Sequence, residues 1–111
     1  MQGQWGETVI HDFTSGQDGI YPYGPLAIDA SGNLYGTTWQ SLIGNVGGAG
    51  IVFKLSRTSP SVWQETILHN FVSPGDGGNP YSGVALDSSG NVFGTSYYGG
   101  VGAGVVFEIT P

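Results

Sequence analysis

The sequence contains no cysteine and only two basic residues. Without cysteine there are no disulfide bridges and no thiolate ligands for a metal ion, so the sequence gives no signal of redox compartment. Eight acidic residues against two basic ones give a net charge of −6. This balance argues against the basic patches that binding to nucleic acids or anionic membranes requires. We therefore expect neither a nucleic acid nor a membrane as a partner.

Charged residues and long apolar runs are also scarce. Charged residues make up 9% of the 111 residues, whereas glycine contributes 21 residues and aromatic side chains 13%. No apolar run approaches the length of a membrane span, and the N-terminal MQGQWGE lacks the basic and apolar regions of a signal peptide. A disordered chain would have high charge and few aromatics. The composition is instead typical of a turn-rich, all-β protein with short strands.

The chain repeats itself at an offset of 58 residues, which falls to 54 after residue 40 because the first copy carries four extra residues. Three pairs of segments show the repeat: WGETVIHDF (5–13) and WQETILHNF (63–71), DASGNLYGTT (29–38) and DSSGNVFGTS (87–96), and GAGIVFKLS (48–56) and GAGVVFEIT (102–110). The two repeats cover about residues 5–58 and 63–111. A period in this range indicates a propeller, a solenoid or a similar array.

Each repeat holds four short β-like runs separated by Gly, Pro, Ser, Asn and Asp. Four strands per fifty residues predict a propeller blade of four antiparallel strands, with two blades per chain. We place the most polar run outermost, so the strand order in the first blade is 23–30, 33–39, 50–56 and 63–71. The second blade then has only three strands, at 81–88, 91–97 and 104–110.

The run at 5–13 is left over by this assignment. Two blades cannot close a ring, and two apolar blade faces would be exposed. We therefore expect a homo-oligomeric ring in which each chain gives residues 5–13 to its neighbour, through a heterologous interface that closes. Three chains would give six blades and four would give eight, and the long, glycine-rich repeats favour four.

These residues also carry a family resemblance. The pattern ETVIHDF, DGIYPY, GNLYGTT and GAGIVFKLS, written twice over essentially the whole chain, resembles the bacterial tandem repeat called the GloVer repeat. The resemblance implies several copies in a row and an extracellular or cell-surface location of the parent protein. It brings no catalytic residues to transfer.

Several recurring residues have structural interpretations. Asp29 and Asp87 precede Gly-Asn pairs between two β runs, which predicts tight hairpin turns rather than catalytic or metal sites. Gly36 and Gly94 lie inside strand runs, where glycine marks a bulge or a close backbone approach.

His11 and His69 recur once per repeat, without a partner at metal-ligand spacing. Each has only one recurring acid nearby, Glu7 or Glu65, four residues earlier on the same strand. A cross-strand or stacking role is the favoured interpretation, so the sequence predicts no metal site and no cofactor.

Loops 14–23, 40–50, 72–81 and 98–104 are expected on one face of the blades. The candidate ligand-binding residues on them are Asp18, Tyr21, Tyr23, Trp39, Asp76, Tyr81, Tyr97 and Tyr98. Aromatic side chains beside carboxylates are suited to stack on sugar rings and to accept their hydroxyl groups, and Asp18 and Asp76 with backbone carbonyls could hold a hard cation. The favoured alternative is structural, with Pro-Tyr packing the loop base and Asp-Gly forming turns.

Two classes of function remain open at this point. One is a non-enzymatic scaffold or binding module that recognises glycans. The other is a fragment of a larger propeller hydrolase or lyase with its site around the channel. Most acidic residues recur as matched pairs, whereas enzymes usually need asymmetric residues. The sequence therefore favours the first class and identifies no catalytic residue.

Overall fold

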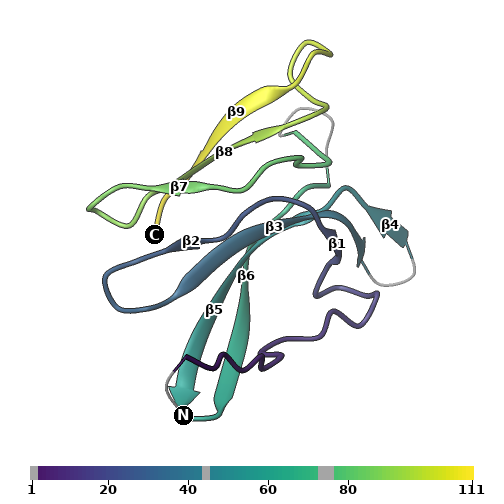
Figure 1. Cartoon of the computed structure of the whole chain (residues 1–111). Helices are drawn as coiled ribbons and strands as arrows, with labels where there is room; N and C mark the ends of the chain where they lie inside the picture. Colours follow the sequence, from purple (N-terminus) through teal and green to yellow (C-terminus); the bar gives the residue numbers. More distant parts are fainter. Residues whose placement is uncertain (1–2, 44–45, 73–76) are drawn as a thin grey trace.

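The computed structural model describes residues 3–43, 46–72 and 77–111, and these ranges form strands but no helix (Figure 1). That part of the chain accordingly has no helix long and apolar enough to cross a membrane. The strands are β1 (Ile20–Pro22), β2 (Ala27–Ile28), β3 (Leu34–Ile43), β4 (Val46–Gly48), β5 (Ile51–Ser59), β6 (Val62–Asn70), β7 (Ala85–Leu86), β8 (Val92–Ser96) and β9 (Val105–Ile109). All pair antiparallel. The predicted all-β class is therefore confirmed.

The first sheet has the strand order expected from the sequence. Its path is β1-β3-β5-β6, and β2 pairs with the same strand, β3, as β1 does. Of the run expected at 23–30 only β2 forms a strand, because Gly24 and Pro25 interrupt the run, and β1 lies just before it. In Figure 1 the sheet forms the lower layer of the molecule.

The second sheet has three strands, in the order β7-β8-β9, and forms the upper layer in Figure 1. Its registers copy those of the first sheet. Gly94 pairs with Phe107 as Gly36 pairs with Phe53. The β7–β8 pairs likewise correspond to the β2–β3 pairs at an offset of 58 residues. The edge of β9 that corresponds to the β6-binding edge of β5 has no strand beside it among the described residues.

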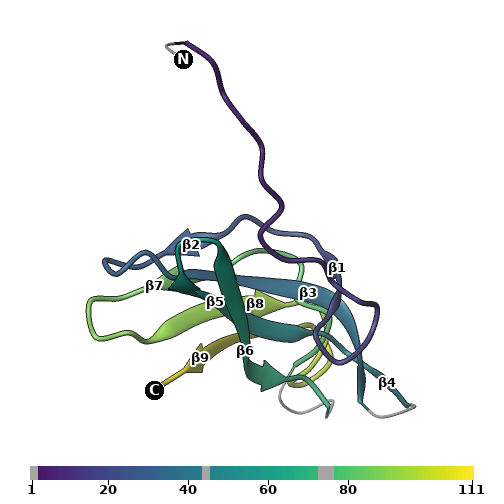
Figure 2. The same cartoon turned by 90° about the horizontal axis from the view of Figure 1, so that it is seen from below.

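Residues 4–13 belong to no strand and run away from the two sheets (Figure 2). Trp5 is 98% exposed and Val9 66% exposed. The segment touches the first sheet only near its end, where Ile10 and Phe13 pack against an apolar cluster on β5. The strand predicted at 5–13 is therefore absent from the single chain, in whose described part no strand pairs with this segment.

The two faces of β5 have different surroundings. Val52 points into a core shared by both sheets, with Tyr35, Phe71 and Val92. The opposite face of β5 carries the cluster of Ile51, Phe53 and Leu55, which residues of the N-terminal segment, β3 and β6 partly cover. The first sheet is thus apolar on both faces, as in the inner layer of a stack of sheets.

Two regions predicted as loops form strands instead. In the region 40–50, β3 continues as far as Ile43 and pairs with β4, in a register that runs from Ser41↔Gly48 to Ile43↔Val46. The four-residue insertion therefore extends a hairpin, whose backbone hydrogen bonds the sequence pattern did not reveal. Between the runs expected at 50–56 and 63–71, β5 extends to Ser59, a turn follows at Pro60 and Ser61, and β6 begins at Val62.

The turn and glycine predictions have a clear structural outcome. The Asp29 carboxylate accepts hydrogen bonds from the backbone N–H of Ser31 and Asn33, and Asp87 repeats the pattern, so both are turn formers as predicted. Gly36 does mark a close approach, but of an aromatic ring and not of backbone. A Cβ there would lie 2.6 Å from Cζ of Phe53.

Candidate functional site

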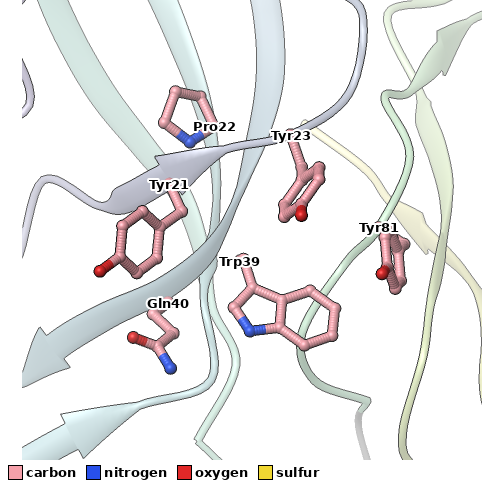
Figure 3. Close-up of a pocket in the computed structure, with 6 residues that line it drawn as sticks. All are labelled: Tyr21, Pro22, Tyr23, Trp39, Gln40 and Tyr81. Atoms are coloured by element: carbon pink, nitrogen blue, oxygen red, sulfur yellow. The ribbon is translucent and has the colours of Figure 1, made fainter.

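An aromatic groove lies where the first sheet meets the segment that leads into the second (Figure 3). It has a volume of about 640 Å³ and is lined by Tyr21, Pro22, Tyr23, Trp39, Gln40 and Tyr81. In Figure 3 the indole of Trp39 and the rings of Tyr23 and Tyr81 lie close together, arranged as a triangle. The Trp39–Tyr81 centroid distance is 4.8 Å and the Tyr23–Tyr81 distance 5.2 Å. The rings thus form a continuous apolar surface with polar atoms at its edge.

Strand pairing brings Tyr21 next to Trp39. β1 pairs with β3 at Ile20↔Gln40 and Pro22↔Thr38, which places Tyr21 opposite Trp39. Directly opposed residues of an antiparallel pair present their side chains on the same face. Trp39 is further held through its carbonyl, which accepts a hydrogen bond of 2.8 Å from Nδ2 of Asn79.

The backbone at Tyr21 is strained. Its φ of 61° lies in the left-handed region, which bulky residues rarely adopt. Asn79, the equivalent residue of the second repeat, has a φ of 52°, and asparagine tolerates that conformation far better. Strain of this kind persists where the surrounding structure imposes it, and it concentrates at functional sites.

The aromatic surface continues beyond the groove to Tyr97 and Tyr98. The ring of Tyr97 lies 6.0 Å from that of Trp39 and 4.8 Å from that of Tyr98. Both tyrosines are 54% exposed. The structure thus brings six of the eight predicted ligand-binding residues together: Tyr21, Tyr23, Trp39, Tyr81, Tyr97 and Tyr98.

Asp18, the predicted carboxylate that the structure describes, does not join them. Asp18 does not line the groove, and its side chain instead accepts hydrogen bonds from the backbone and hydroxyl of Thr14. Asp76 lies outside the described residues. The expected pairing of carboxylates with aromatic rings therefore fails for Asp18. The loop turns back on itself at Gly16 and Gly19, so Asp18 lies close to Thr14 and away from the tyrosines that follow it.

Asp18 has different neighbours, which the sequence interpretation missed. His11 Nε2 lies 3.6 Å from Oδ2 of Asp18 and 3.6 Å from Oε2 of Glu65. The stacking role expected of His11 is present, because its ring packs edge-on against Phe13 at 4.6 Å. The recurrence of histidine and glutamate was the available signal. However, the glutamate that approaches His11 comes from the other repeat and is not Glu7 of its own run.

The carboxylates of Glu65 and Asp29 have pKa values shifted in opposite directions. Burial, and then the nearby charge of Asp18, raises the pKa of Glu65 to about 7. Hydrogen bonds from Asn33, with smaller ones from Tyr35 and Ser31, lower the pKa of Asp29 to about 2. Asp29 is therefore a stable anion engaged in its own turn, whereas Glu65 is a carboxylate whose charge is poorly compensated.

No family model matches the chain, and neither a curated protein nor a solved structure matches it. The resemblance to the GloVer repeat therefore remains a prediction.

Proposed function

We propose that the chain is a non-enzymatic binding module that assembles with copies of itself into a closed β-propeller, and that its aromatic groove binds neutral carbohydrate. One observation carries the assembly. The end of the N-terminal segment packs on the first sheet as the end of β6 packs on the second.

The ring contacts at the two positions are nearly the same. Phe71, directly after β6, meets Phe107 of the second sheet at 5.2 Å and 65°. Phe13 meets Phe53 of the first sheet at 5.4 Å and 66°. In this proposal residues 5–13 form the outer strand of a preceding sheet, and the matching contact of Phe13 supports it. In this proposal the other three strands of that sheet are β7, β8 and β9 of a second copy.

The exposed apolar residues support the same arrangement. Val106 is 80% exposed, whereas its equivalent Val52 is fully buried between the sheets. On the first sheet, Ile28 is 67% exposed, whereas its equivalent Leu86 packs into the shared core. Within the chain, the face of the first sheet that carries Val52 packs against the face of the second sheet that carries Leu86. The exposed faces that carry Val106 and Ile28 are the equivalents of these two faces, so they can pack against each other between copies. Stacking copies head to tail would bury both.

The number of chains follows from closure. The interface is heterologous, so a ring forms when the rotation between copies divides a full turn. Three or four chains of two sheets each fall in the usual range of propeller sizes, and the long, glycine-rich repeats favour four.

An engineered disulfide tests the strand exchange, because the chain has no native cysteine. In the first sheet Lys54 pairs with Thr66, and the equivalent cross-chain pair is Glu108 with Thr8. The double variant Thr8→Cys, Glu108→Cys should form disulfides between chains under oxidising conditions. Lys54→Cys, Thr66→Cys is the positive control and should form its disulfide within one chain. Thr8→Cys, Val106→Cys is the displaced-register control.

The outcome is measured as mass under non-reducing conditions. We expect a covalent ladder that ends at about 35 kDa for three chains of 11.5 kDa or about 46 kDa for four. A clean monomer in the matched-register variant, or equal cross-linking in the displaced one, would refute the exchange.

The carbohydrate proposal rests on the groove. Stacked aromatic rings accept the apolar face of a sugar, while tyrosine hydroxyls and the Gln40 amide can hydrogen-bond its hydroxyl groups. The residues that line the groove include no charged side chain, which favours a neutral ligand. A ring of copies would repeat the groove, so multivalency would raise a weak affinity per site.

A glycan array probed with the purified protein tests this proposal. We expect binding that Trp39→Ala and Tyr23→Ala abolish. Val62→Ala changes an exposed apolar residue that does not line the groove, so this variant should retain binding. Calcium should have no effect, because no carboxylate lines the groove. Absence of binding above background, or binding that both groove variants leave unchanged, would refute the carbohydrate proposal.

A further inference from the structure

A second cluster of polar side chains lies away from the aromatic groove, between the N-terminal segment and the first sheet. It consists of His11, Asp18 in the turn before β1, and Glu65 on β6. One nitrogen and two carboxylate oxygens, one atom from each residue, all lie within 4.8 Å of one another. Three separate parts of the chain therefore converge on one point.

Two of the three atoms lack compensation. Nε2 of His11 and Oε2 of Glu65 are buried, and neither makes a hydrogen bond with any described residue. The side chain of Glu65 is only 10% exposed. A buried carboxylate oxygen without a partner is rare and costly, and in a native structure it indicates a missing ion, water or proton. The raised pKa of Glu65 agrees with this, because burial and the charge of Asp18 both disfavour its anion.

The other groups of the cluster are held in place. The N–H of Thr14 donates to Oδ2 of Asp18 at 3.0 Å, and its hydroxyl donates to Oδ1 at 2.8 Å. The ring of His11 is fixed edge-on against Phe13. Such contacts behind the ligating residues are what orient the donors of metal sites.

We propose that His11, Asp18 and Glu65 bind one divalent cation of the zinc type. One imidazole nitrogen and two carboxylate oxygens suit Zn²⁺, Co²⁺ and similar ions, whereas Ca²⁺ needs six to eight oxygen ligands. With ligand distances of 2.0–2.1 Å, donor atoms in a tetrahedral site are roughly 3.3 Å apart. The two observed separations of 3.6 Å therefore need only a small contraction.

The cation would tie the N-terminal segment to the first sheet. His11 is the only one of the three ligands outside residues 14–70, so binding would fix the end of the segment that is otherwise attached through Ile10 and Phe13. All three ligands belong to one chain. The inference therefore stands or falls independently of the ring and of carbohydrate binding.

Titration of the full-length, metal-free protein with Co²⁺, followed by its visible absorption, tests the site. We expect one equivalent per chain, displaced by Zn²⁺. His11→Gln and Glu65→Gln should each weaken binding by roughly tenfold or more. Asp12→Asn removes an exposed carboxylate next to His11 and should bind as the wild type does. His69→Gln serves as the control for adventitious binding to a surface histidine.

Glu65→Gln should fold, since it replaces the buried carboxylate with a neutral group of the same shape, and circular dichroism checks this. Zn²⁺ should raise the melting temperature of the wild type and of Asp12→Asn but not of Glu65→Gln. Absence of stoichiometric binding in the wild type, or equal binding in the His11 and Glu65 variants, would overturn the proposal.

Discussion

Replacement of valine by threonine at two equivalent positions separates folding from assembly. Val52 and Val106 occupy matching places on β5 and β9, but Val52 is fully buried in the single chain and Val106 is 80% exposed. Threonine keeps the shape and the β propensity of valine but replaces one methyl group with a hydroxyl. Burial of that hydroxyl without a partner costs about 1–3 kcal/mol.

The two variants should therefore fail in different assays. Val52→Thr should lower the free energy of unfolding by about 1–3 kcal/mol, measured by denaturant titration. Val106→Thr should change it by less than about 0.5 kcal/mol, because the side chain faces solvent in the single chain. The same 1–3 kcal/mol should instead appear at each junction between copies, where it weakens association by roughly five- to 150-fold. Sedimentation velocity over a range of concentrations measures this shift.

Either of two results would refute the reasoning. If Val106→Thr leaves association unchanged over the whole concentration range, the face that carries Val106 is not an interface between copies. If it destabilises the fold as strongly as Val52→Thr does, the exposure of Val106 in the structure is wrong.

Three further predictions concern other parts of the fold. Gly36→Val should lower the stability of the fold by about 1–3 kcal/mol through overpacking against Phe53, as measured by thermal unfolding. Gly6→Val is the control and should be neutral, because nothing lies within 4 Å of the added Cβ. A neutral Gly36→Val would contradict the close approach. The pKa of Asp29 is lower in the fold than in the unfolded chain, so its contribution to stability is present above pH 3.8 and is lost as pH falls toward about 2. Asp29→Asn should flatten the acid limb of a stability–pH profile in that window, and an unchanged limb would count against the turn hydrogen bonds. Deletion of residues 1–14 should abolish the oligomer or cause aggregation through exposed edges, and a truncated protein with unchanged mass and melting temperature would show that the segment has no role in assembly.

The elements that the sequence predicts best are those fixed by local chemistry. The turn at Asp29 requires only that an aspartate carboxylate accept backbone hydrogen bonds from the residues after it. The sequence Asp-Ala-Ser-Gly-Asn is typical of such a turn. The strand order of the first sheet follows from four successive short runs when the most polar run is placed outermost. The convergence of Tyr23, Trp39 and Tyr81 could also be predicted, because the topology of a four-stranded sheet places their loops on one face.

The features that the sequence does not predict depend on contacts between distant segments. The hairpin of β3 and β4 requires backbone pairing across a glycine-rich stretch that has no β-branched pattern on one side. The meeting of His11 with Glu65 depends on how the N-terminal segment crosses the first sheet. Sequence spacing suggested Glu7 for His11 and a solvent-facing loop for Asp18, since nothing in the letters indicates which repeat's glutamate approaches which histidine.

The hairpin of β3 and β4 has a consequence for any ring built from this chain. It belongs to the first repeat only, because the second repeat lacks the four inserted residues. Successive sheets around such a ring would therefore be of two alternating kinds, one with a projecting hairpin and one without. The rotational order of the assembly would equal the number of chains, which is half the number of sheets. A ligand that touches the hairpin would bind once per chain. Averaging all sheets as equivalent during image reconstruction would blur this hairpin first.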